Sequence, residues 1–244
     1  MENYIYGIHP AIEAIKSGKE INKVFIRKGM QSEQLGALLK LLNQYNIPTQ
    51  FIPAEAFNKY TRKNHQGVLA IVSPVEYQPY DEIIHRVFAS GRDPFVLVLD
   101  GITDVRNFGA IARSAECAGV NAIIITMINN PGITPDAVKT SAGALNTIPV
   151  CRVKNLPDTI KQLKNSGLEI VACTSKNDTP YTEHDFKKPL ALVMGSEEKG
   201  ISPVVLKETD YCIGIPVMGS IDSLNVSVAT AVVMYEVIRQ RKLS

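Results

Sequence analysis

Three short polar segments carry the residues that could bind a ligand and act on it. They span residues 100–113, 195–200 and 215–227, and each is rich in glycine, in side-chain amides or in both. Asn107 and Arg113 stand out in the first segment, because the planar fork of an arginine suits a phosphate or another anion. The chemistry available is therefore that of amide, guanidinium, carboxylate and hydroxyl groups.

Asn107 and Arg113 flank the start of a helix that we expect over Gly109–Ala118. Asn107 stands where an N-cap residue belongs. Arg113 follows within two turns, where the helix macrodipole disfavours a cation, so another interaction should hold it there. Anchoring a phosphate is one such interaction, and an ion pair with Glu116 is the other. The segment alone leaves both alternatives open.

The segment 195–200 predicts a sharp turn directly after a buried strand. Its two glycines allow the backbone to bend and to approach a ligand closely. Glu197 and Glu198 lie between these glycines, and a simple solvated turn would place them there equally well. Ser196 and Lys199 match the S-x-x-K pattern of serine acyl-enzymes, but the other signatures of that class are absent, so we reject that interpretation.

The segment 215–227 leads from a strand that stops at a proline into the last helix, expected over Asn225–Lys242. Ser223 or Asn225 can cap this helix, and Ser227 adds a third polar group at its start. The helix is apolar on more than one face, which indicates deep burial or contact with a second copy of the chain. Three polar groups beside two other polar loops favour a binding pocket over simple capping.

The elements that must position these segments alternate between strands and helices. Apolar runs typical of strands buried on both faces lie at Pro94–Leu99, Ala122–Thr126, Ile170–Cys173, Leu190–Met194 and Tyr211–Ile215. Helical stretches separate these runs, so we expect an α/β domain over 95–244 with a mostly parallel sheet and with ligands beyond the carboxyl ends of its strands. Shorter strands and helices predict a small α/β domain over 1–75, and prolines indicate a linker at 76–94.

Missing motifs exclude several classes of protein. The chain has no G-x-G-x-x-G after the first strand of the sheet, no Walker A motif and no G-x-S-x-G. The four histidines lack metal-ligand spacing and the four cysteines lie 22 or more residues apart, so we expect no metal, no disulfide framework and a reducing cytoplasm. The first residues lack a secretory signal, and the longest uncharged apolar run, Val120–Ile128, is too short to span a bilayer. Transfer of a group already activated on a cosubstrate fits these features better than hydrolysis.

Charge is spread unevenly along the chain. Residues 1–75 carry nine Lys and Arg against five Asp and Glu, whereas residues 76–244 carry 17 against 19. A basic small half beside a near-neutral larger half is compatible with one module that meets an anionic polymer and one that does chemistry. A solvated basic face is the simpler alternative.

The three segments, in this order and spacing, resemble the three motifs of the SpoU/TrmH family of RNA ribose 2′-O-methyltransferases, in the SPOUT superfamily. The stretches concerned are LDGITDVRNFGAIARSAECAGV, LVMGSEEKGIS and IPVMGSIDSLNVSVATAVVMYEV, and the match spans 95–241. YIYGIHPAIEAI and NHQGVLAIV resemble the substrate-binding domain that precedes the catalytic part in many members. With both halves matched, the chain is most similar to 23S rRNA guanosine 2′-O-methyltransferases. Val105 stands where the family often has proline, which affects loop stiffness and no functional group.

The resemblance implies S-adenosylmethionine as methyl donor, a trefoil knot in the C-terminal domain and a homodimer with the active site near the interface. Carried over by position, it implies a donor pocket at Gly195, Ser196, Ile215, Met218 and Leu224 and a reaction centre at Asn107, Arg113, Glu197, Ser223 and Asn225. Arg113 would stabilise the developing alkoxide, and Glu197 is the competing candidate for the base. The family proposal makes the arginine the base, but a guanidinium stays protonated in proteins and is a poor proton acceptor.

The N-terminal domain would hold the RNA. The side chains that flank its strand ends and could contact phosphates and bases are Arg27, Lys28, Arg62, Lys63, Asn64, His65 and Gln66. Each of them alone could equally be ordinary surface. Two alternatives stay open: a tRNA substrate in place of rRNA, and a non-catalytic RNA-binding or ribosome-assembly protein on the same fold. The intact reaction-centre set speaks against the second alternative, and we expect no membrane partner.

Overall fold

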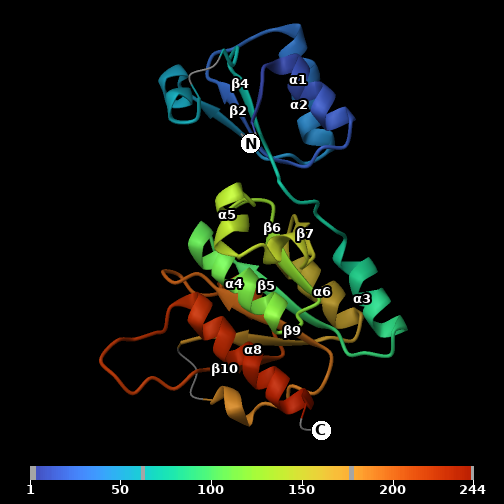
Figure 1. Cartoon of the computed structure of the whole chain (residues 1–244), viewed down its shortest axis with the longest axis vertical. Coiled ribbons are helices and arrows are strands. Elements are labelled where there is room, and N and C mark those ends of the chain that lie inside the picture. The colour runs from blue at the N-terminus through green and yellow to red at the C-terminus, as the bar shows by residue number, and fades with distance from the viewer. Residues whose placement is uncertain (1–3, 62–63, 176–178, 243–244) are drawn as a thin grey trace. The chain divides into compact units, whose positions relative to one another are not determined.

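Two β-sheets organise the chain, and each belongs to a unit of its own (Figure 1). The structure is a computed structural model and describes residues 4–61, 64–175 and 179–242. The first unit comprises Met1–Glu76 with Gly132–Pro135, and the second comprises Tyr77–Pro131 with Asp136–Ser244.

The first unit is a four-stranded sheet with two α-helices packed on one face and a 3-10 helix on the other. Its elements are β1 (Tyr4–Tyr6), α1 (Ile8–Lys16), β2 (Ile21–Arg27), α2 (Glu33–Gln44), β3 (Thr49–Ile52), the 3-10 helix η1 (Ala54–Lys59) and β4 (Val68–Val72). The strand order is β1-β4-β2-β3, and only β2 and β3 run parallel to each other. Buried side chains of α1 and α2, among them Ile15, Leu38 and Leu42, form one core with the sheet. The expected small α/β domain is therefore present.

Local sequence explains where the two helices of this unit begin. Helix α1 starts at Ile8, and Pro10 lies in its first turn, where a missing N–H group costs nothing. Helix α2 starts after Ser32, whose Oγ accepts a hydrogen bond from the backbone N of Leu35 at 3.1 Å. Strand β1 has only three residues, too few for a visible periodicity.

The second unit is a six-stranded sheet in which all neighbouring strands are parallel. The strand order is β10-β8-β9-β5-β6-β7. Its elements are α3 (Tyr80–Ala89), β5 (Phe95–Asp100), α4 (Val105–Cys117), β6 (Ala122–Thr126), α5 (Pro135–Thr140), η2 (Ala144–Asn146), β7 (Val150–Val153), α6 (Leu156–Asn165), β8 (Glu169–Cys173), η3 (Tyr181–Glu183), β9 (Leu190–Gly195), α7 (Pro203–Leu206), β10 (Tyr211–Ile213) and α8 (Val226–Lys242).

Helices cover both faces of this sheet, as continuous apolar strands require. In the central strand β5, Val96 and Val98 share a core with buried side chains of α3 and α6. Alternation along the strand turns Leu97 and Leu99 toward the other face, where α4 and α8 lie against each other (Figure 1). The expected α/β class with a mostly parallel sheet is confirmed, whereas the trefoil knot stays a prediction.

Two features of the second unit differ from the sequence expectation. A sixth strand, β7, escapes the apolar pattern because it is a short edge strand that carries Arg152, whose guanidinium lies 4.3 Å from the centre of the Tyr77 ring. The segment expected to be a linker belongs to the second unit from Tyr77 onward. Gln78 N donates to Val150 O at 2.9 Å, and α3 buries three apolar side chains against the sheet. The prolines of this segment mark bends in an ordered chain.

The far end of α8 is fastened to the loops that precede β5 and β9. Arg241 donates hydrogen bonds to three backbone carbonyls, those of Phe186, Lys188 and Asp93, at 2.7–3.1 Å. Gln240 accepts from Phe186 N at 2.9 Å and donates to His184 O at 2.9 Å. These hydrogen bonds hold the C-terminal end of the last helix against the loops that lead into the sheet.

Candidate active site

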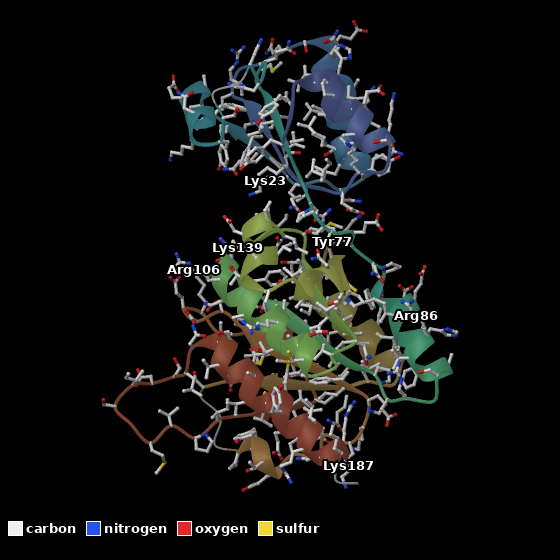
Figure 2. All side chains as sticks on the ribbon, in the orientation of Figure 1. Lys23, Tyr77, Arg86, Arg106, Lys139 and Lys187 are labelled. Atoms are coloured by element: carbon white, nitrogen blue, oxygen red, sulfur yellow. The ribbon has the colours of Figure 1, made fainter. Side chains whose placement is uncertain are left out.

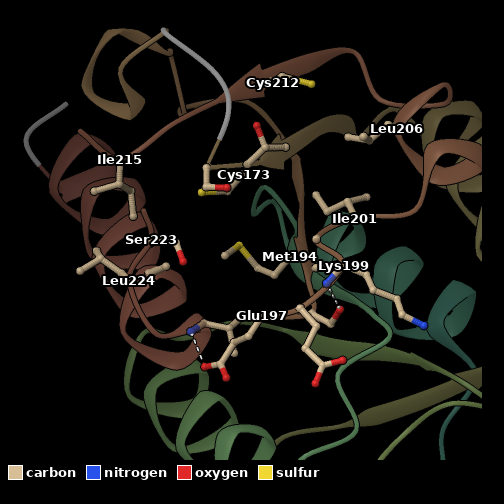
Figure 3. A pocket seen from close by; sticks show the side chains of 18 of the residues that line it. Cys173, Met194, Glu197, Lys199, Ile201, Leu206, Cys212, Ile215, Ser223 and Leu224 are labelled. Carbon is tan, nitrogen blue, oxygen red and sulfur yellow. Dashed lines mark hydrogen bonds between the residues drawn. The ribbon is translucent and has the colours of Figure 1, made fainter. Parts of the chain in front are cut away.

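A cavity of about 560 Å³ lies beyond the carboxyl ends of β8, β9 and β10 (Figure 3). This is the edge where ligands of open parallel sheets bind. Most of the lining is apolar, and Figure 3 shows Met194 near its centre with Ile215 and Leu224 toward one side. Glu197 and Glu198 place two carboxylates at its border. Lys199 adds a cation to the lining, and a pocket of this size and character suits a small organic molecule.

The turn after β9 can be built only with glycine at position 195. A Cβ atom there would lie 2.2 Å from both Gly200 C and Ile201 N, far inside van der Waals contact. Ser196 and Gly200 close the turn with backbone hydrogen bonds of 3.2 and 2.8 Å. The expected sharp bend is present, and the close approach that requires glycine at position 195 is to the backbone of the turn itself. The expected close approach to a ligand stays a prediction.

The first segment joins the same edge through β5, which pairs with β9 so that Asp100 lies opposite Gly195. Asp100 Oδ2 accepts a hydrogen bond from Ser202 N at 2.7 Å, which ties the loop after β5 to the turn after β9. Gly101 has a φ of +71°, a conformation that favours glycine. Two of the three polar segments are thus connected at the ends of neighbouring strands.

A hydrogen-bonded network at the mouth of the cavity connects all three segments. Asn225 Nδ2 donates to Asn107 Oδ1 at 3.0 Å and also to Glu197 Oε1. Glu197 Oε1 accepts a second hydrogen bond, from Val226 N at 3.2 Å, which Figure 3 draws as a dashed line. Three polar side chains that are far apart in sequence therefore meet at one point.

The N-cap of α4 is Asp104, and the expectation that Asn107 caps this helix is wrong. Asp104 Oδ1 accepts from the backbone N of Asn107 at 2.8 Å, and the helix starts at Val105. A carboxylate at this position serves the helix dipole better than an amide does. The side chain of Asn107 is thus available for Asn225. Asn225 itself caps α8, because its Oδ1 accepts from Ser227 N at 2.9 Å.

Arg113 is exposed on α4, and the expected ion pair with Glu116 does not form among the residues that the structure describes. Its guanidinium has no hydrogen-bond or ionic partner within residues 4–61, 64–175 and 179–242. Figure 2 helps to locate helix α4, because it labels Arg106 at the start of this helix. Arg113 therefore remains available to an anion. Of the two alternatives for this residue, phosphate binding is the one that stays open.

The structure gathers most of the expected donor-pocket residues and leaves one outside. Gly195, Ser196, Ile215 and Leu224 line the cavity, as does Ser223 from the expected reaction centre. Met218 does not line it and is 96% exposed. Asn107, Arg113 and Asn225 do not line it either, and Asn107 and Asn225 reach its border through Glu197.

Sequence reasoning missed a fourth contributing segment, which follows β8. Cys173, Thr174 and Ser175 line the cavity, together with Leu206 and Cys212 from other elements. The loop after β8 contains no glycine and so gave no local signal. Its position beyond the carboxyl end of a parallel strand was the only signal that could have revealed it.

Of the two cysteines in this lining, Cys173 should react slowly. All four cysteines are free thiols, and burial raises the pKa of Cys173 to about 11. A raised pKa leaves little thiolate at pH 8, and the thiolate is the form that reacts. We expect iodoacetamide at pH 8 to alkylate the exposed Cys117 at least about tenfold faster than Cys173. Peptide mass spectrometry checks this, with urea-unfolded protein as the control, and equal rates in the folded protein would contradict it.

The expected RNA contacts in the first unit cluster around the end of β2. Arg27 and Lys28 are exposed there, and Gly67 N donates to His65 Nδ1 at 3.1 Å in the neighbouring turn. The His65 ring stacks on Phe57 with ring centres 4.2 Å apart, and burial together with the charge of Arg27 lowers its pKa. Asn64 and Gln66 are exposed in this turn, whereas Arg62 and Lys63 lie outside the described residues.

Neither a metal-binding group nor a membrane-spanning helix occurs in the part of the chain that the structure describes. No three His, Cys, Asp or Glu side chains in that part could jointly hold a metal ion. None of its helices is both long enough and apolar enough to cross a bilayer.

Comparison with solved structures identifies the class of fold. The SpoU methyltransferase AviRb from Streptomyces viridochromogenes, solved with AdoMet, is 24% identical over 99% of this chain and 91% of its own, with a TM-score of 0.62. An AdoMet-bound rRNA methyltransferase from Sinorhizobium meliloti is 25% identical over 97% of this chain and 86% of its own, again with a TM-score of 0.62. The fold is thus that of the SpoU methyltransferases.

Sequence comparison identifies the family. The profile of the SpoU rRNA Methylase family matches residues 94–235, and a profile for RNA 2′-O ribose methyltransferase substrate binding matches residues 4–78. A Staphylococcus saprophyticus protein named as a TrmH family tRNA/rRNA methyltransferase is 40% identical over 98% of this chain and 96% of its own. A Staphylococcus aureus protein of the same name is 36% identical over 98% and 97%. This chain belongs to the SpoU (TrmH) family of RNA methyltransferases.

Proposed function

We propose that this protein transfers the methyl group of S-adenosylmethionine to a ribose 2′-hydroxyl of RNA, with a guanosine of 23S rRNA as its target. The observation that carries the proposal is the network of Asn107, Glu197 and Asn225 at the mouth of the cavity. Arg113, which has no partner among the described residues, lies on the same helix as Asn107. The resemblance of both halves to 23S rRNA guanosine methyltransferases supports the choice of substrate.

The cavity suits the proposed methyl donor. Its volume of about 560 Å³ lies in the range of small-molecule sites, and its apolar walls suit an adenosine. Gly195, Ser196, Ile215 and Leu224 would hold the donor, and the Glu198 carboxylate at the border would complement its cationic groups. When bound, S-adenosylmethionine supplies a methyl group on a positively charged sulfur, which is already a strong electrophile.

The protein then has to align the nucleophile and stabilise its charge. The ribose 2′-oxygen forms a bond to the methyl carbon while the carbon–sulfur bond breaks and its electron pair stays on sulfur. The hydroxyl proton leaves to solvent water. Arg113 would stabilise the negative charge that builds on the oxygen and contact the adjacent phosphate. Ser223, which lines the cavity, would orient the ribose.

A second copy of the chain would complete the assembly. Several large apolar side chains are exposed around the start of α8 and along it, namely Ile221, Leu224, Val228 and Tyr235. An exposed apolar row of this kind is typical of a protein–protein interface. We place the interface of a homodimer here, next to the network at the mouth of the cavity.

Mapping of ribose methylation across total RNA tests the proposal. RNA from cells with and without this protein should differ at one guanosine of 23S rRNA, and the purified protein should restore the mark with S-adenosylmethionine. If the missing methylation is found on tRNA instead, the substrate is tRNA and the proposed reaction is unchanged. Identical maps, together with no binding of S-adenosylmethionine, would favour a non-catalytic RNA-binding or ribosome-assembly protein.

The basic end of β2 should contribute phosphate contacts. Replacing Arg27 and Lys28 by alanine removes two cations, so we expect weaker binding of ribosomal RNA and a slope of log affinity against log salt smaller by about 1.5. Lys16 and Lys19, near the opposite end of β2, provide a double-alanine control with no change expected. Filter-binding titrations over a salt series measure both slopes, and an unchanged slope for the first pair would exclude them as RNA contacts.

A further inference from the structure

The side-chain amide of Asn225 is fully occupied inside the protein. Its Oδ1 accepts hydrogen bonds from Ser227 N at 2.9 Å, Ser227 Oγ at 2.6 Å and Val228 N at 3.4 Å. Because backbone N–H groups only donate, the atom that faces them must be the amide oxygen. Both hydrogens of Nδ2 then have acceptors, on Glu197 and on Asn107. Asn225 has no polar group left for a substrate.

The orientation of Asn225 decides which end of Asn107 can meet a substrate. Asn107 Oδ1 receives the N–H group of Asn225 at 3.0 Å. Its Nδ2, with two hydrogens to donate, has no acceptor among the described residues. Such a donor at the mouth of the cavity suits an oxygen atom that gains negative charge.

We propose that Glu197, acting through Asn225, holds Asn107 with its amide N–H groups turned toward the ribose 2′-oxygen. Glu197 is then a positioning residue, Asn107 is the catalytic hydrogen-bond donor, and neither takes the proton. This inference rests on the proposed function. As the carbon–oxygen bond forms and the carbon–sulfur bond breaks, Asn107 and Arg113 share the stabilisation of the oxygen, and the hydroxyl proton leaves to water.

Glu197 is better placed for holding the cleft together than for accepting a proton. Its Oε1 accepts from Asn225 and, at 3.2 Å, from Val226 N. These donors lie at the start of α8, where the helix macrodipole stabilises a negative charge. Protonation would weaken both hydrogen bonds, because a neutral carboxyl is a poorer acceptor than a carboxylate. Using Glu197 as the base would therefore loosen the network during the reaction.

Two substitutions of matched shape separate the roles. Glu197→Gln keeps an oxygen that can accept both hydrogen bonds but cannot take up a proton, so we expect kcat within about threefold of the wild type and the same pH profile. Asn107→Asp keeps the acceptor for Asn225 but replaces the donor by a negative charge, so we expect kcat to fall about 10²–10³-fold. The assay is methyl incorporation from S-adenosylmethionine into ribosomal RNA isolated from cells that lack the protein.

Matched controls lie on exposed helix positions elsewhere in the second unit. Glu82→Gln on α3 and Asn165→Asp at the end of α6 make the same chemical changes and should leave kcat unaltered. A loss of kcat in Glu197→Gln as large as in Asn107→Asp, with the acid limb of the pH profile abolished, would overturn the inference and make Glu197 the base. Near-normal turnover of Asn107→Asp would overturn it as well.

A binding measurement distinguishes failure of this inference from failure of the proposed function. Calorimetric titration with S-adenosylmethionine needs no RNA, and we expect Glu197→Gln to bind like the wild type and Glu197→Ala to bind about tenfold more weakly. If the wild type methylates no RNA while this order holds, the proposed reaction is wrong, and what stands is only that Glu197 holds the network of Asn225 and Asn107 at the cavity. If both variants weaken binding alike, the positioning role is wrong.

Discussion

Replacing Arg113 by alanine is expected to lower kcat for RNA methylation by about 10²–10³-fold. The guanidinium stays protonated, lies exposed on the helix that carries Asn107, and shares its charge with no other described residue. Its loss therefore removes a cation that would stabilise the developing alkoxide. Because Arg113 does not line the cavity, affinity for S-adenosylmethionine should stay within about threefold of the wild type. Methyl incorporation at saturating RNA gives kcat, and calorimetry gives the affinity.

Two further variants make this result specific. Arg113→Lys keeps the charge and loses the planar fork, so an intermediate loss of kcat is expected. Arg86→Ala removes an exposed arginine on α3, elsewhere in the unit (Figure 2), and should change nothing. Near-normal turnover of Arg113→Ala with RNA still bound would show that the arginine has no part in the reaction.

Gly195→Ala is expected to abolish the donor site while the rest of the sheet survives. A methyl group there would overlap the backbone of Gly200 and Ile201 at 2.2 Å, so the turn after β9 must open. Opening moves Glu197 away from Asn225 and breaks the network. We expect the free energy of unfolding to fall by about 2–3 kcal/mol and S-adenosylmethionine affinity to fall about 100-fold.

The matched control for this substitution is Gly36→Ala. Gly36 lies in α2 with nothing near its absent Cβ, so alanine should stabilise the protein by about 0.5–1 kcal/mol through its higher helix propensity. Urea denaturation and calorimetry compare the two variants directly. If Gly195→Ala binds the donor as tightly as the wild type, the turn does not form the wall of the donor site.

The sequence predicts the second sheet well because its strands obey one strong physical rule. Strands buried on both faces need continuous apolar runs, and the four inner strands β8, β9, β5 and β6 have them. The edge strand β10 also has a short apolar run, although its Tyr211 is exposed. The sixth, β7, is an edge strand whose Arg152 stacks on Tyr77, a contact that no local pattern reveals. The residues after Tyr77 resemble a linker in the sequence, because only the folded structure shows that α3 packs against the sheet.

The site is predictable to the level of segments and less so to the level of atoms. Sequence predicts that Gly195, Ile215 and Leu224 belong to one site, since their loops follow strands of a parallel sheet, and the structure has all three around one cavity. It assigns the cap of α4 to Asn107 because amides and carboxylates are both good caps, and only the folded chain shows Asp104 in that role. Met218, in a loop whose backbone no periodic pattern fixes, lies outside the cavity.

The hydrogen bonds that hold the C-terminal end of α8 mean that substitutions there can affect the distant site. Arg241 lies about 22 Å along the helix from Val226, at 1.5 Å per residue. Because Gln240 and Arg241 fix one end of α8 to the loops before β5 and β9, they also fix the direction in which its other end presents Asn225 and Val226 to Glu197. A random library selected for impaired methylation should therefore yield substitutions at Gln240 and Arg241, although both residues lie far from the cavity. Their effect would come from a change in the orientation of α8.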